Sequence, residues 1–149
     1  MIISSKGRYG VRAMFVLAQR YAQGPQSIKQ IAAQEALSET YLEQLFAKLR
    51  ASGLVVSARG AGGGYRLARS PATISVGEIL IALEGPLSPA DCVLDSCENS
   101  HDCATHAIWC RIYEGINSVV NSITLQDMLD DYAAQHSACR TGRTSVKCR

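Results

Sequence analysis

The stretch that decides the fold is residues 38–67, SETYLEQLFAKLRASGLVVSARGAGGGYRL. Four apolar side chains in its first part recur at the spacing of one helical face: Leu42, Leu45, Phe46 and Leu49. They predict an amphipathic helix that Ser38 caps and that runs to about residue 51, where a nearby glycine stops it. Residues 54–57 then predict a short strand and residues 65–67 a returning strand, with a glycine-rich turn between them.

Two helices are expected before this stretch. Residues 5–22 place apolar side chains near one face, and the following Gly24 and Pro25 end helices. Ser27 and Gln30 have the spacing of a capping box, which predicts a second, short helix. Two short helices, a tight turn and a hairpin predict a winged helix-turn-helix, so the expected fold class is mainly α with a small β wing.

The second half of the chain predicts a different unit. Ser75 and Glu78 repeat the capping-box spacing and open a helix that Gly85 ends. The elements expected after it are a loop over residues 86–102, a long helix from about Cys103 to Ser122 and a short helix over 125–134. The expected division is a winged helix-turn-helix domain over 1–72, a loop and dimerisation helix over 73–134, and a disordered basic tail over 135–149.

Charge is distributed unevenly along the 149 residues, although the net charge is only +2. Residues 1–75 carry ten basic and three acidic side chains, whereas residues 76–134 carry ten acidic side chains and one arginine. A basic half joined to an acidic half favours a polyanion-binding module followed by a unit that does not touch the polyanion. A chance segregation of solvated charges is the alternative.

Neither a membrane span nor a signal peptide is expected. No apolar run approaches the roughly 18 residues that a spanning helix needs. The N-terminus lacks the charged, apolar and small-residue blocks of a secretion signal, so the cytoplasm is the expected location.

The predicted helix over residues 38–51 has a polar outer face that fits the major groove of DNA. That face carries Glu39, Thr40, Glu43, Gln44 and Lys48. Gln44 suits adenine, Thr40 suits a phosphate or a thymine methyl group, and Glu43 accepts only from a donor such as cytosine N4. A solvated helix face is the alternative for this helix taken alone.

The predicted wing supplies separate support for DNA binding. Its glycines allow backbone amides to approach phosphates closely, and Arg59 can enter a minor groove or pair with a phosphate. A flexible hairpin tip is the alternative. The candidate DNA-contacting residues are Lys6, Arg8, Ser38, Thr40, Tyr41, Glu43, Gln44, Arg59, Gly60, Gly62, Gly63 and Tyr65.

Six cysteines lie in the second half of the chain, and no secreted context favours disulfides. Cys92-x4-Cys97-x5-Cys103-x2-His106 places three thiols and an imidazole within fifteen residues. Such soft donors suit zinc or an iron–sulfur cluster, and the spacing leaves both open. Cys110, one turn beyond the histidine, is either a rival fourth ligand or part of the core, and the core is the favoured interpretation. The last two cysteines, at 139 and 148, are expected to be free thiols.

The predicted long helix carries more apolar surface than a small winged-helix domain can cover. Its apolar residues include Ile108, Ile112, Ile116, Val119, Val120 and Ile123. A second copy of the chain would cover this surface, and a two-fold dimer would present two recognition helices to a palindromic site. Packing of the helix onto its own subunit is the alternative.

Five segments together resemble the IscR-like regulators of iron–sulfur cluster assembly. They are Ser5-Lys-Gly-Arg-Tyr9, Tyr41-Leu-Glu-Gln-Leu-Phe46, Arg59-Gly-Ala-Gly-Gly-Gly-Tyr65, Ser75-Val-Gly-Glu78 and Thr105-His-Ala-Ile-Trp109. The resemblance implies a homodimeric bacterial repressor or activator that senses a 2Fe–2S cluster and recognises double-stranded DNA. It implies no small-molecule substrate and no membrane partner.

Carried over to this sequence, the resemblance implies that Cys92, Cys97, Cys103 and His106 hold the cluster. It also implies that Thr40, Glu43, Gln44 and Arg59 contact DNA, with the glutamate making target choice depend on cluster occupancy. The first cysteine gap is four residues here, where the best-known members have five.

Two rivals remain at this stage. A nitric-oxide-responsive relative with a 4Fe–4S cluster takes an acidic N-terminal ligand from the partner subunit, whereas this chain has Lys6-Gly-Arg8 there. The other rival is a zinc-stabilised DNA-binding module with no sensing role. An enzyme is not expected, because no nucleophile–base set appears in the sequence.

Overall fold

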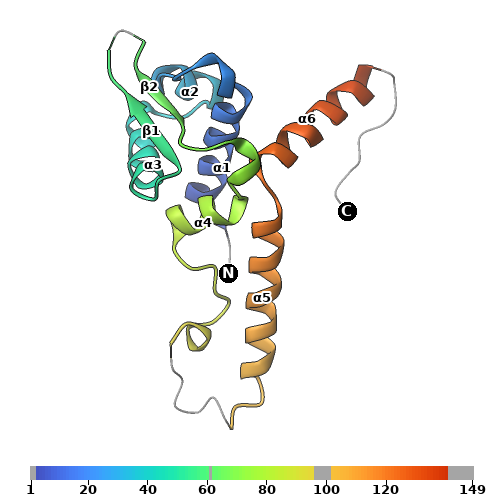
Figure 1. Cartoon of the computed structure of the whole chain (residues 1–149). Helices are drawn as coiled ribbons and strands as arrows, with labels where there is room; N and C mark the ends of the chain where they lie inside the picture. Colours follow the sequence, from blue (N-terminus) through green and yellow to red (C-terminus); the bar gives the residue numbers. More distant parts are fainter. Residues whose placement is uncertain (1–2, 61, 96–101, 141–149) are drawn as a thin grey trace.

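The computed structural model describes residues 3–60, 62–95 and 102–140, with side chains described as far as Ser137. Figure 1 shows a body formed by the N-terminal helices and the wing, from which α5 extends on one side and α6 on another. The α-helices are α1 (Ser5–Gln19), α2 (Ile28–Glu35), α3 (Glu39–Ala51), α4 (Val76–Glu84), α5 (His106–Ser122) and α6 (Leu125–Arg140). The strands are β1 (Val55–Ala58) and β2 (Gly64–Leu67), and the short 3-10 helices are η1 (Tyr21–Gln23), η2 (Pro71–Thr73) and η3 (Asp91–Val93).

The helix starts follow the serines that the sequence singles out. The side chain of Ser27 accepts a hydrogen bond from the Gln30 amide, and the Gln30 side chain accepts one from the Ser27 amide. Ser75 and Glu78 form the same reciprocal pair at the start of α4. Both predicted capping boxes are therefore confirmed, and each satisfies two backbone donors that the first turn leaves free.

The core lies between α1, α3 and α4. The predicted apolar stripe of α3 is confirmed, because all four of its members are buried: Leu42, Leu45, Phe46 and Leu49. Helix α1 approaches α4 closely at Gly10, where an added Cβ would lie 1.9 Å from Leu83 Cδ1. A side chain at Gly10 would therefore require the buried Leu83 side chain to move.

The two wing strands pair antiparallel, with Val55 opposite Leu67 and Ala58 opposite Gly64. Strand β1 is shifted by one residue toward the tip from the predicted segment 54–57, and β2 begins one residue before the predicted segment 65–67. The wing is also tied to the body, since the Gln26 and Tyr65 backbones exchange two hydrogen bonds of 2.8 Å. Gly64 has a φ of +156°, and a Cβ there would lie 2.2 Å from the Gln26 carbonyl oxygen, so this junction requires glycine.

Two predicted helix boundaries, the end of α1 and the start of α5, are wrong. Helix α1 ends at Gln19 and a separate 3-10 turn follows, where one helix to residue 22 was expected. Helix α5 begins at His106, so Cys103 lies before the helix and not in its first turn.

The expected disordered tail from residue 135 is wrong for residues 135–140, because α6 continues through Arg140. The His136 ring lies against the Tyr132 ring at 3.9 Å, and its Nδ1 lies 2.9 Å from the Tyr132 carbonyl oxygen. These contacts, one turn apart, extend the helix beyond the apolar pattern that predicted it. Residues 141–149 lie outside the described part. None of the described helices is long and apolar enough to cross a membrane.

Candidate DNA-binding surface and cysteine site

The outer face of α3 is available to a ligand. Thr40, Glu43 and Gln44 are exposed, and none of them has a hydrogen-bond or ion-pair partner within the described part of the chain. The opposite face is locked into the core, so the helix cannot rotate without exposing its leucines. A polar face held in this way can present donors and acceptors in a fixed register to base edges.

Ser38 and Tyr41 orient this helix. The Ser38 hydroxyl accepts a hydrogen bond of 3.2 Å from the Tyr41 amide, which caps α3. The half-buried Tyr41 ring meets the Tyr9 ring edge-on, with centroids 6.2 Å apart. Arg12, which is also on α1, lies over the Tyr9 ring, 5.6 Å from its centre. The contact between the two tyrosine rings holds the N-terminus of α3 against α1.

The four wing glycines differ in whether the fold requires the absence of a side chain. Gly60 has a φ of +109°, which favours glycine, and Gly64 leaves room for the Gln26 backbone. At Gly63 an added Cβ would lie 2.7 Å from the Ala58 carbonyl oxygen. At Gly62, by contrast, a Cβ would meet nothing within 4 Å. The fold therefore gives no reason for glycine at Gly62.

Tyr65 sets the position of the wing relative to α3. Its ring lies 4.6 Å from the Phe46 ring, and Phe46 is fully buried in the core. This contact joins strand β2 to the recognition helix, and the backbone pairing with Gln26 ties the same strand to the segment before α2. Tyr65 is only half-buried, so part of its side chain remains accessible.

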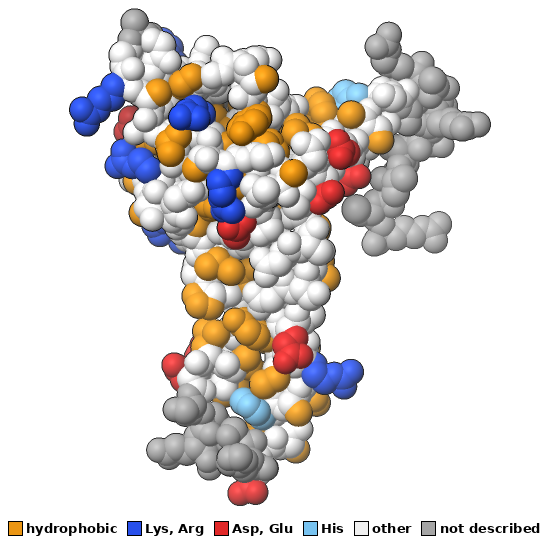
Figure 2. Space-filling view, viewed as in Figure 1, with side chains coloured by type: hydrophobic (Ala, Val, Ile, Leu, Met, Phe, Trp, Pro, Cys, Tyr) orange, Lys and Arg blue, Asp and Glu red, His pale blue; other side chains and the backbone are white. Residues whose placement is uncertain are grey.

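The basic side chains of the N-terminal half divide into two groups. Arg12 pairs with Glu35 at 2.6 Å, and Arg20 donates to Gln26 at 2.9 Å, so both are engaged within the fold. A second group is exposed, and its side chains have no hydrogen-bond or ion-pair partner among the described residues: Lys29, Lys48, Arg50, Arg59 and Arg66. Figure 2 shows Lys and Arg side chains gathered over the body that carries α3 and the wing. The second group is the one free to meet phosphates.

The start of α1 is held by a carboxylate from α4. Glu84 accepts from the Ser4 amide at 3.1 Å and the Gly7 amide at 2.8 Å, and Lys6 lies 3.8 Å from its other oxygen. Burial opposes ionisation, but the hydrogen bond from the Ser4 hydroxyl, the two amide hydrogen bonds and the Lys6 charge hold the pKa of Glu84 below its ordinary value. Lys6 is therefore partly committed to the fold, whereas Arg8 has only a 3.4 Å contact with Ser5.

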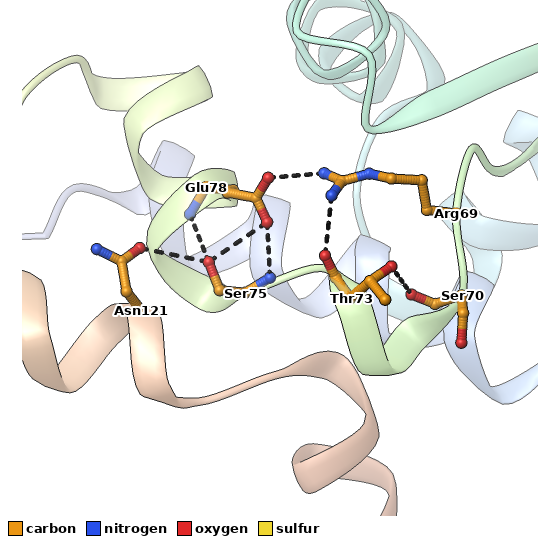
Figure 3. Close-up of polar contacts among 6 residues, drawn as sticks. All are labelled: Arg69, Ser70, Thr73, Ser75, Glu78 and Asn121. Carbon is orange, nitrogen blue, oxygen red and sulfur yellow. Dashed lines mark hydrogen bonds and ion pairs between the residues drawn. The ribbon is translucent and has the colours of Figure 1, made fainter.

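A polar junction connects the wing to the long helix (Figure 3). Arg69, just after β2, pairs with Glu78 of α4 at 2.6 Å. The other Glu78 oxygen accepts from the Ser75 amide at 3.0 Å, and the Ser75 hydroxyl donates to Asn121 of α5 at 3.4 Å. Burial opposes the shift, but the Ser75 and Arg69 contacts lower the pKa of Glu78. The capping box could be predicted from the spacing of Ser75 and Glu78. The contacts of Arg69 and Asn121 could not, because they depend on tertiary packing.

The predicted cysteine ligands are only partly described. Cys92 in η3 and Cys103 are free thiols, and Cys97 lies outside the described residues. Hydrogen bonds from Thr105, first through its side chain and then its backbone, and from the His106 amide lower the pKa of the exposed Cys103 thiol. Among the described residues, no group of three His, Cys, Asp or Glu side chains lies close enough to hold a metal ion.

Cys110 contacts the histidine of this set. The favoured expectation of a core residue is wrong, because Cys110 is half-buried and its Sγ lies 3.5 Å from His106 Nε2. The other ring nitrogen, Nδ1, is buried and has no hydrogen-bond partner in the described part of the chain. An unpartnered buried nitrogen and free thiols fit a metal group in their chemistry.

Helix α5 is not covered by its own subunit. None of its residues is buried, and large apolar side chains such as Ile108 and Val119 are 51% and 59% exposed. Among the described residues, α5 packs mainly against η3 and α4. Packing of the whole helix onto its own domain, which the sequence left as an alternative, is therefore not found.

Comparison with known proteins identifies the family. A model of the Rrf2 family, described as an iron-dependent transcriptional regulator, matches residues 3–131. The chain belongs to the Rrf2 family. The expectation of a DNA-binding transcription regulator with a winged helix-turn-helix is thereby confirmed, and relatives of this kind are not enzymes.

Two kinds of Rrf2 relative resemble this chain. It is 45% identical over 128 residues to the HTH-type transcriptional regulator CymR of Bacillus subtilis, covering 86% of this chain and 89% of CymR. It is 38% identical over 132 residues to the HTH-type transcriptional regulator IscR of Yersinia pseudotuberculosis, covering 88% and 80%.

Solved structures that resemble this chain include the same two kinds of relative, IscR and CymR. The structure of T. potens IscR has a TM-score of 0.73 at 48% identity and covers 89% of this chain and 88% of that one. The structure of B. subtilis CymR, described as the global cysteine regulator, has a TM-score of 0.73 at 46% identity and covers 86% and 95%. Rrf2 membership alone therefore does not distinguish cluster sensing from cysteine regulation.

Proposed function

We propose that this Rrf2 protein is a homodimer that binds a palindromic operator and regulates transcription according to the state of a 2Fe–2S cluster. The cluster ligands are Cys92, Cys97, Cys103 and His106, and the regulated genes are those of iron–sulfur cluster biogenesis. The observation that carries the proposal is the His106 ring nitrogen Nδ1, which is buried and has no hydrogen-bond partner among the described residues. It lies at the start of α5, near the free thiols of Cys103 and Cys110.

The donor set suits this cofactor. Thiolates and imidazole are the protein ligands of iron–sulfur clusters, and a set with one histidine raises the reduction potential relative to four cysteines. The lowered pKa of Cys103 favours the thiolate that a metal takes. Segment η3, which carries Cys92, packs against α5 and so brings that thiol's segment to the helix that His106 begins. A bound cluster would supply a group that changes charge on oxidation and is lost under oxidative stress.

The partner in the dimer is a second copy of this chain. The apolar face of α5 is continuous along the helix and includes Ile108, Ile112 and Val119. A pocket lined by Ile108, Arg111 and Ile112 lies on the same helix. The apolar face that α5 leaves exposed beside its contacts with α4 and η3 is covered most simply by the same helix related by a two-fold axis.

A two-fold dimer presents two copies of α3 and the wing. Each copy offers Thr40, Glu43 and Gln44 to base edges, while Arg59 and the wing amides meet the phosphates. Several further residues complete the proposed DNA-contacting set, some of them by orienting the contacting elements: Lys6, Arg8, Ser38, Tyr41, Gly60, Gly62, Gly63 and Tyr65. Glu43 is an acceptor facing a polyanion, so it favours sites with a cytosine donor at its position and disfavours others.

The second candidate is a regulator that responds to cysteine supply without a cluster. The similar identity to CymR, described as a global cysteine regulator, favours it. A zinc-stabilised module and a 4Fe–4S regulator use the same thiols and differ from the main proposal in the metal bound.

Anaerobic purification with metal and sulfide analysis distinguishes these candidates. We expect coloured protein with equal iron and sulfide, close to two of each per chain, and loss of the visible absorption in a Cys92→Ser variant. Colourless protein that contains no iron or sulfide, even after reconstitution, would refute the cluster proposal. Zinc in such a protein would favour the structural module, and no metal at all would favour the cysteine-responsive regulator.

A further inference from the structure

The His106 imidazole has one ring nitrogen engaged and the other free. Its Nε2 lies 3.5 Å from Cys110 Sγ, one helical turn further along α5. Its Nδ1 is buried and has no hydrogen-bond partner among the described residues. Because an unsatisfied buried polar atom costs free energy, the folded protein gains from any group that engages Nδ1.

The two possible tautomers of the ring are not equivalent here. With the proton on Nε2, the N–H donates to Cys110 Sγ and Nδ1 presents a lone pair. With the proton on Nδ1, the thiol donates to Nε2, and a buried N–H is left with no acceptor. The first arrangement leaves an electron pair that a metal can use, whereas the second leaves a donor that a metal cannot satisfy.

A histidine that binds a metal ordinarily donates its other ring N–H to a fixed acceptor, which selects the tautomer and orients the ring. The acceptor is usually a carboxylate, a carbonyl or a water. Among the described side chains, only Cys110 lies within hydrogen-bond distance of His106 Nε2, so its sulfur can be the acceptor in this chain.

We infer that Cys110 is a positioning residue: its sulfur accepts the His106 Nε2–H and leaves Nδ1 as the nitrogen that binds the cluster. Cys110 is not itself a ligand. The part of the inference that concerns cluster binding by Nδ1 rests on the proposed function. The part that concerns the tautomer does not, because the apo protein adopts that tautomer without a cluster.

The first test is nitrogen NMR of His106 in the full-length, folded apo protein, which reports which ring nitrogen carries the proton. We expect the wild type to hold its proton on Nε2, and Cys110→Ala to give a mixture of tautomers. Cys110→Ser, which restores a hydrogen-bond acceptor, should return the ring to the Nε2–H form. An Nδ1–H ring in the wild type, or an unchanged ring in Cys110→Ala, would overturn the inference whether or not a cluster binds.

The second test follows the reconstituted cluster by absorption and electron paramagnetic resonance. Loss of an orienting partner costs about tenfold to a hundredfold in metal affinity, so Cys110→Ala should lose iron to a chelator at least tenfold faster. Its reduction potential should shift, and Cys110→Ser should recover most of the wild-type retention. Cys148→Ala is the matched control for removal of a thiol and should retain iron as the wild type does.

Two outcomes of the second test would overturn the inference. In one, Cys110→Ala retains iron at the wild-type rate and potential. In the other, Cys110→Ala loses the cluster spectrum while His106→Ala keeps it, which would make Cys110 a ligand. A wild type that binds no cluster would refute the proposed function instead, and the NMR result would still decide the role of Cys110.

Discussion

The glycine at position 62 allows a sharp test of the wing. A Cβ at Gly62 would meet no atom within 4 Å, whereas a Cβ at Gly63 would lie 2.7 Å from a backbone oxygen. Gly62→Ala should therefore leave the free energy of unfolding within about 1 kcal/mol of the wild type, on the stabilising side. Gly63→Ala should lower the free energy of unfolding by about 1–3 kcal/mol, because the backbone must shift.

DNA affinity should respond differently at Gly62. If its backbone approaches a phosphate, a methyl group there obstructs one amide–phosphate hydrogen bond, worth about 1.5 kcal/mol or roughly tenfold in Kd. The slope of affinity against salt should stay at the wild-type value, because no charge is removed. Fluorescence anisotropy with a palindromic site selected by the protein measures both quantities. Wild-type affinity in a stably folded Gly62→Ala protein would refute this account of the wing.

Three further predictions concern other contacts. Arg59→Ala should weaken binding and reduce the magnitude of the salt slope by about one per wing, whereas an unchanged slope would remove Arg59 from the phosphate contacts. Ile112→Glu should weaken the dimer more than roughly 100-fold in sedimentation, since it buries unpaired charges, and a dimer of wild-type strength would exclude α5 as the interface. Glu84→Gln should destabilise the protein at pH 7 in urea unfolding. Because the pKa of Glu84 is lowered in the fold, the stabilisation is present above its ordinary pKa and is lost as the pH falls through the lowered value. The wild type and Glu84→Gln should thus converge in acid, and a constant difference would contradict the role of the carboxylate.

Local patterns in the sequence were sufficient to predict much of the DNA-binding half. The buried stripe of α3 and the capping boxes at Ser27 and Ser75 each depend on residues within one or two helical turns. Such contacts form whenever the segment is helical, so spacing alone reveals them.

Features that depend on distant partners could not be predicted in this way. The Glu84 carboxylate caps a helix that begins almost eighty residues earlier, and Gly10 is required by a leucine on α4. At the cysteine site, α5 begins at His106, so Cys103 precedes the helix, and Thr105 provides no side-chain cap that would mark this start in the sequence. A contact between His106 and Cys110 could be predicted from the sequence, since the two residues are one helical turn apart. Only the structure shows that Nε2 is the ring nitrogen that contacts the sulfur.

The most direct test of the central claim compares the DNA selected by cluster-loaded and apo protein. Random duplexes would be selected anaerobically with the wild type in both forms and with Cys92→Ser. We predict that the loaded and apo wild type enrich different palindromes, that Cys92→Ser matches the apo protein in both preparations, and that Glu43→Ala reduces the difference. Identical sites and affinities for the loaded and apo wild type would contradict cluster-controlled regulation.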